Sequence, residues 1–108
     1  MSAEKIKSEL IIASKLITEI ESVEEKNVDG AKKLLMSFLD ALKGEIRLAR
    51  NVSGLRDFDE IEAKIEEIRH NVNLLKFSEA LKNVSETISF VTNIGQQAMH
   101  ELAERNLL

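Results

Sequence analysis

The stretch from Ala31 to Val52, AKKLLMSFLDALKGEIRLARNV, decides the fold class. Its apolar residues recur every three or four positions, which is the spacing of one face of an α-helix. They are Ala31, Leu34, Leu35, Phe38, Leu39, Leu42, Ile46, Ala49 and Val52. We therefore expect a helix over residues 30–53, with Asp29 as its N-cap and Gly54 in the left-handed conformation just after its end.

Three further stretches repeat this spacing and predict helices over residues 3–25, 58–75 and 78–104. Ser2 and Ser78 are expected caps, because a serine hydroxyl accepts a hydrogen bond from a free backbone N–H. Asp59 and Glu62 have the spacing of a capping box in the third helix. The apolar stripes are Ile6, Leu10, Ala13, Leu16, Ile17, Ile20 and Val23, then Ile61, Ile65, Ile68, Val72 and Leu75, then Leu81, Val84, Ile88, Val91, Ala98, Met99 and Leu102.

Four helices joined by short turns predict an all-α protein with one domain over residues 1–108. Short turns make successive helices antiparallel, so we expect an up-down-up-down four-helix bundle built from two antiparallel helical hairpins. The alternative is two long hairpins that complete their core only in a dimer. Gly95 lies on the last apolar stripe, where glycine is less favourable than alanine by about 1 kcal/mol. We interpret Gly95 as a point of close approach between helices.

The composition excludes several classes of protein. The 108 residues include no Cys, and 15 Lys plus Arg stand against 19 Asp plus Glu, so the net charge is −4. Without Cys, disulfide-stapled folds, Cys-based zinc sites and Cys nucleophiles are excluded. No stretch offers the roughly 20 apolar residues that a membrane-spanning helix requires. We expect a cytoplasmic protein, because the first residues lack the basic and apolar pattern of a secretion signal.

Several side chains outside the apolar stripes are candidates for an interaction surface. Phe90 and Ile94 lie one turn apart and are expected to point roughly 120° and 80° away from the centre of the last stripe. The second helix is basic and the third is acidic, so their charged residues either form solvated faces or pair with each other, within the chain or across a dimer. Arg47 and Arg50, on the outer side of the basic helix, complete the predicted interaction residues.

Glu9 and Glu45 are the strongest candidates for chemistry. Both have apolar neighbours three and four positions away, and each lies 18 residues from Asn27, so a hairpin that turns there places them at the same height. Two carboxylates in one apolar layer do not both stay ionised without cost. Three outcomes are open: one carboxylate is protonated, a cation such as Arg69 or a divalent metal joins them, or one of them lies at the edge of the layer.

Other acidic residues give weaker predictions. Glu67 and His70 have the Glu-x-x-His spacing of di-iron bundles, but His70 is expected to face solvent and a second such motif is missing. Glu62 and Glu66, with Glu9 and Glu45, would form a carboxylate bundle that binds a divalent ion. The sequence predicts no catalytic residue and no cofactor.

These observations favour a non-enzymatic helical bundle that binds protein partners, with self-association into a homo-oligomer expected. The alternative is a divalent-metal-binding carboxylate bundle that acts as a nucleotide phosphohydrolase. A third hypothesis is nucleic-acid binding through Lys32, Lys43, Arg47 and Arg50. The acidic net charge and the absence of aromatic residues beside these four weigh against it. No association with membranes is expected.

Overall fold

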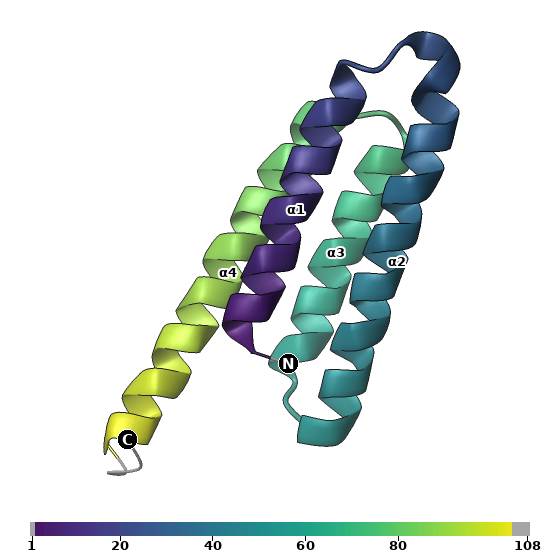
Figure 1. The fold of residues 1–108 in the computed structure, drawn as a ribbon. Coiled ribbons are helices and arrows are strands. Elements are labelled where there is room, and N and C mark those ends of the chain that lie inside the picture. Colours follow the sequence, from purple (N-terminus) through teal and green to yellow (C-terminus); the bar gives the residue numbers. More distant parts are fainter. Residues whose placement is uncertain (1, 105–108) are drawn as a thin grey trace.

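The computed structural model describes residues 2–104, with side chains described as far as residue 96. It contains the helices α1 (Ala3–Glu21), α2 (Val28–Ser53), α3 (Asp57–Asn73) and α4 (Phe77–Glu104), and a short 3-10 helix, η1 (Glu25–Asn27). Consecutive helices run antiparallel, and α1 also packs against α4, which closes the bundle (Figure 1). The prediction of an all-α, up-down-up-down four-helix bundle is confirmed.

Each helix turns one stripe of apolar side chains into a single core. Burying a large aliphatic side chain contributes about 2 kcal/mol relative to leaving it in water, so these stripes hold the helices together. The buried apolar residues are Ile6, Leu10, Ala13, Ile17 and Ile20 of α1, Leu35, Leu39, Leu42 and Ile46 of α2, Ile61, Ile65, Ile68 and Val72 of α3, and Ala80, Val84 and Val91 of α4. One chain is therefore sufficient to build the core.

The predicted stripe of α2 was wrong at two of its members. Leu34 is 76% exposed and Val52 is 83% exposed. Leu35, Leu39 and Ile46 take the inward positions, and Leu34 and Val52 lie roughly 100° or more around the helix from them. The predicted apolar stripe was therefore too wide, and it included two surface residues in the core.

The orientation of α4 also differs from the predicted one. Ala80, Asn83 and Thr87 are buried, whereas Leu81 and Ile88 are only half-buried. The Thr87 hydroxyl donates a hydrogen bond to the carbonyl oxygen of Asn83 at 2.7 Å, so this polar group is satisfied inside the core. The predicted stripe counted large apolar residues alone, and it missed small and polar residues that face the core.

Two of the predicted helix ends are confirmed. The Ser2 hydroxyl accepts a hydrogen bond from the Lys5 backbone N–H at 3.1 Å and caps α1. Gly54 has a φ of 72°, and its N–H donates to the Arg50 carbonyl oxygen at 2.8 Å, which ends α2. The Gly95 prediction also agrees with the structure, because a Cβ built on Gly95 would lie 3.2 Å from the Cβ of Ala3.

The other predicted caps were wrong. Asp29 lies inside α2, which begins at Val28 directly after η1, and Ser78 lies inside α4, which begins at Phe77. The helix α3 begins at Asp57 without a side-chain cap, so Asp59 and Glu62 form no capping box there. Backbone hydrogen bonds take the place of these side-chain caps. The Asn27 N–H of η1 donates to the Glu24 carbonyl oxygen before α2, and the Phe58 N–H donates to the Leu55 carbonyl oxygen at the start of α3.

Leu75, predicted as a core residue of α3, instead lies in the turn to α4. Its φ of 60° is in the left-handed region. Its N–H donates to Val72 at 3.0 Å and the Lys76 N–H donates to Asn71 at 2.8 Å, which is the hydrogen-bond pattern of a Schellman motif. A left-handed conformation costs a residue with a Cβ roughly 1–2 kcal/mol.

We expect Leu75→Gly to leave the protein more stable than Leu74→Gly, by about 1 kcal/mol. Both leucines are 47% exposed, so the lost apolar contact is similar, but Leu74 has a φ of −85° and gains nothing from the missing Cβ. Urea unfolding of the two variants measures the difference. Equal free energies of unfolding would contradict the assigned strain at Leu75.

Candidate functional site

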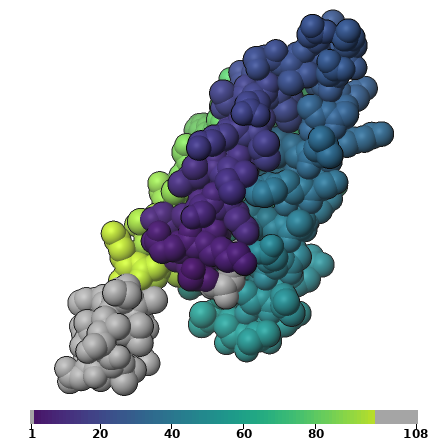
Figure 2. All heavy atoms as spheres, viewed as in Figure 1, coloured from purple at the N-terminus to yellow at the C-terminus, as the bar shows by residue number. Residues whose placement is uncertain are grey.

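A groove of about 460 Å³ runs along the C-terminal half of α2, and we call it the α2 groove. It lies near the end of the molecule where α1 begins and α2 ends, coloured purple and teal in Figure 2. Its lining residues are Lys5 of α1, Glu45, Leu48, Ala49, Val52 and Ser53 of α2, Leu55 of the following turn, and Phe58 of α3.

The apolar character of the α2 groove follows from helical spacing. Glu45, Leu48 and Val52 are three and four positions apart, so they share one face of α2, beside the buried stripe. Leu48 is 65% exposed, Val52 83% and Leu55 56%. Scattered apolar residues are normal on a monomer, whereas these three line one groove together.

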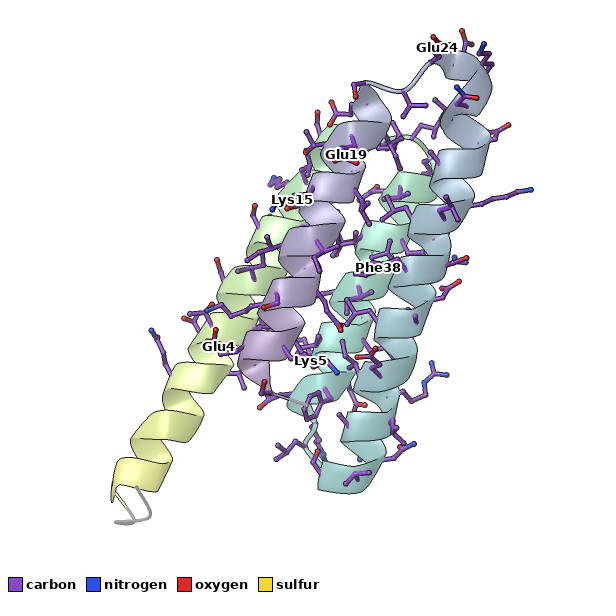
Figure 3. The ribbon with its side chains drawn as sticks, viewed as in Figure 1. Glu4, Lys5, Lys15, Glu19, Glu24 and Phe38 are labelled. Carbon is purple, nitrogen blue, oxygen red and sulfur yellow. The ribbon has the colours of Figure 1, made fainter. Side chains whose placement is uncertain are left out.

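Two charged residues, Lys5 and Glu45, border the α2 groove. The Lys5 Nζ lies 3.7 Å from Glu45 Oε2, and Figure 3 shows Lys5 extending from α1 towards α2. Glu9, one turn further along α1, is half-buried, and its Oε2 is buried without a hydrogen-bond donor among the described residues. Burial raises the pKa of Glu9, the Glu45 carboxylate raises it further, and Lys5 partly offsets both effects.

The predicted proximity of Glu9 and Glu45 is thus found, and the two act on each other electrostatically. Their surroundings match two of the three outcomes that the sequence left open. Glu45 lies at the exposed edge of the layer, and the raised pKa of Glu9 favours its protonated form. Arg69, which the sequence left open as a cation joining the two carboxylates, instead donates to Asp40 Oδ1 at 2.7 Å, and Lys5 lies beside Glu45.

We expect Glu9→Gln to raise the free energy of unfolding at pH 7 by about 1 kcal/mol, because an amide N–H₂ can donate to Glu45 where a carboxylate repels it. A raised native pKa destabilises the protein above that pKa, and the penalty disappears as the pH falls below the unfolded value of 4.5. Urea titrations should therefore show that the stability gained by Glu9→Gln over wild type decreases as the pH is lowered from 7 to 4. Glu19→Gln, an exposed change on the same helix, serves as the control.

The described residues contain no group of three or more His, Cys, Asp and Glu placed to hold a metal ion. Glu9 and Glu45 are brought together, but Glu62 and Glu66 lie elsewhere, each bound to a basic residue of α2. His70 is exposed, as predicted. The carboxylates that the metal hypothesis grouped are thus divided between two faces of the bundle.

The basic and acidic helices pair within the chain, through four ion pairs between α2 and α3 that we call the charge ladder. Lys43 Nζ lies 2.5 Å from Glu66 Oε2, and this hydrogen bond is the main cause that lowers the pKa of Glu66. The complete set is Asp40–Arg69, Lys43–Glu66, Arg47–Glu62 and Arg50–Asp59. Lys32 donates to the Asn73 carbonyl oxygen at 3.4 Å. The predicted basic stripe is therefore largely matched by acidic groups.

Phe90 and Ile94 lie half-buried against the core, rather than pointing away from it. The Lys64 ammonium lies 5.1 Å from the centre of the Phe90 ring, a cation–π contact. Ile94 contributes to a small pocket of about 60 Å³ with Ala3 and Phe58. A role for Phe90, Ile94, Arg47 and Arg50 in partner binding stays a prediction, and the first two offer only part of their surface for it.

Sequence reasoning missed a polar network between α3 and α4. Asn71 Nδ2 donates to Asn83 Oδ1 at 2.6 Å, and Asn83 Nδ2 donates to Glu67 Oε1 at 3.2 Å. Asn83 is only 8% exposed. The signal for it was available, because Asn83 stands three positions after Ala80 and four before Thr87, on the buried face of α4.

The fold and the α2 groove define a small four-helix bundle with an exposed apolar surface at one end. No family model, no curated protein and no solved structure matches the chain. Among the described residues, no helix has the length and apolar character to cross a membrane.

Proposed function

We propose that this protein is a non-enzymatic interaction module that binds protein surfaces, a second copy of itself included, through the α2 groove. The observation that carries the proposal is the group of exposed apolar side chains in the groove, formed by Leu48, Val52 and Leu55. Water contact with these side chains is unfavourable by about 25 cal/mol for each Å² of apolar surface. A partner that covers the groove removes this contact.

The border of the groove supports the same proposal. The Lys5–Glu45 pair is partly exposed, so it offers both a donor and an acceptor at the rim of an apolar centre. Apolar centres with polar rims are typical of protein interfaces. Grooves of this kind receive an amphipathic helix, whose apolar stripe fills the centre.

Sedimentation velocity over a range of concentrations tests the proposal. We expect the mass to rise with concentration, and we expect Leu48→Lys to abolish the rise, because a lysine ammonium is costly to bury in an apolar contact. Leu34→Lys is the matched control, since Leu34 is a similarly exposed leucine on α2 outside the groove. A wild-type protein that stays monomeric at every concentration would contradict self-association through this surface.

A further inference from the structure

The helix α4 extends past the rest of the bundle. The Cβ position of Gly95 lies 3.2 Å from Ala3, the first residue of α1. Ile94 shares a small pocket with Asp57, the first residue of α3. Beyond Gly95, α4 continues to Glu104 without α1 or α3 beside it (Figure 1). We call residues 96–104 the α4 extension.

The apolar spacing of α4 does not stop where the bundle stops. Residues Ala98, Met99 and Leu102 continue the three-four spacing of the stripe along the α4 extension. A helix with such a stripe needs a surface to cover it. The neighbours of α4, namely α1 and α3, begin level with its residues 94 and 95, so neither helix runs beside the α4 extension (Figure 1).

The α2 groove matches the α4 extension in length and chemistry. The groove spans Glu45 to Ser53 on α2, and the extension spans residues 96 to 104, so each is about 12 Å long at 1.5 Å per residue. The extension contains Glu101 and Glu104 and no Lys or Arg. One basic residue, Lys5, lines the groove and also contacts Glu45, and the exposed Arg56 follows the lining residue Leu55 in the chain.

The extension of one chain does not reach its own groove. In the bundle, α2 and α4 occupy diagonal corners, and each packs against α1 and α3. The extension continues in the direction of α4, away from the bundle (Figure 1). A helix that fills the groove must therefore come from another molecule.

We propose that two copies form a dimer by reciprocal exchange, in which the α4 extension of each copy lies in the α2 groove of the other. This deepens the proposed function, on which it rests, by naming the partner and the segment that binds. A two-fold axis makes the two contacts identical and closes the assembly at two copies. This step covers the exposed apolar side chains of the α2 groove.

A complementation experiment in the full-length chain tests the exchange. Val52→Lys disables the groove and Met99→Lys disables the extension, and each alone is expected to weaken dimerisation at least about tenfold. In an equimolar mixture, the intact groove of the Met99→Lys chain accepts the intact extension of the Val52→Lys chain. One of the two contacts is then restored, so we expect the mixture to form heterodimers that neither variant forms alone. Circular dichroism melting verifies that both variants fold.

Disulfide trapping gives a second measurement, because the chain has no cysteine of its own. A Val52→Cys chain mixed with a tagged Leu102→Cys chain is expected to form a mixed disulfide under mild oxidation. Lys26→Cys, in η1 at the opposite end of the bundle, replaces Val52→Cys in the control and should form none.

The outcomes separate this inference from the proposed function. A wild-type dimer that both lysine variants still form, or variants that stay monomeric in the mixture without a mixed disulfide, would overturn the exchange and leave self-association standing. A wild-type protein that is monomeric at all concentrations would overturn both the exchange and self-association through the α2 groove. Restored association together with the mixed disulfide supports the exchange.

Discussion

Replacing Leu39 by alanine is expected to lower the free energy of unfolding by about 3 kcal/mol. Leu39 is fully buried in the middle of α2, where the core stripes of all four helices meet. The truncation removes apolar atoms from the core and leaves a cavity that the packed helices close only in part. The midpoint of thermal unfolding should fall by roughly 10–15 °C.

Leu34→Ala is the matched control, because it makes the same change on the same helix. Leu34 is 76% exposed, so we expect its replacement to alter the free energy of unfolding by less than about 0.5 kcal/mol. Urea titration of both variants compares them directly. Sequence spacing assigned both leucines to the core, so similar losses at the two positions would favour that assignment over the observed one.

Asn83→Asp is expected to destabilise the protein by about 3 kcal/mol at pH 7, although it changes the shape of the side chain very little. Asn83 is buried and donates its amide N–H to Glu67 at 3.2 Å. A carboxylate at this position would lose the donor and repel Glu67 across the same distance. Burial and this repulsion would raise the pKa of the introduced carboxyl in the folded state.

The loss at position 83 should depend on pH in a defined direction. A group with a raised native pKa destabilises the fold above that pKa, and the penalty decreases as acid protonates it. We expect the difference in the free energy of unfolding between Asn83→Asp and wild type to decrease as the pH is lowered from 7 to 4. Asn51→Asp is the control, because Asn51 stands in the same Asn-Val-Ser tripeptide but is exposed. Its effect should stay within about 0.5 kcal/mol.

The four helices and most of their buried stripes were predictable because apolar spacing reports directly on burial. Ile6, Leu10 and Ile65 were assigned to the core and are buried. The rotation of α4 was not predictable from large apolar residues alone. Small and polar residues such as Ala80 and Thr87 are buried when a helix packs between two neighbours and when their polar groups find local partners.

The candidate site was predictable only in part. Counting residues from the turn brought Glu9 and Glu45 together, because an antiparallel hairpin fixes relative height. The α2 groove escaped prediction, since it depends on Val52 lying outside the core and on Leu55 and Phe58 completing its wall. Burial at the margin of a stripe is decided by the distance to the neighbouring helix, which spacing along one helix does not report.

The charge ladder has a consequence for how the α2–α3 hairpin forms. Its residues are spaced by three, four and three positions along both helices, at 40, 43, 47 and 50 on α2 and at 69, 66, 62 and 59 on α3. Shifting α3 by four residues, about one helical turn, in either direction would leave a single opposite-charge pair. One shift would place Arg47 beside Phe58, and the opposite shift would place Arg50 beside Ala63. Exposed pairs contribute at most about 1 kcal/mol each, yet together they penalise every misaligned pairing that a collapsing chain samples.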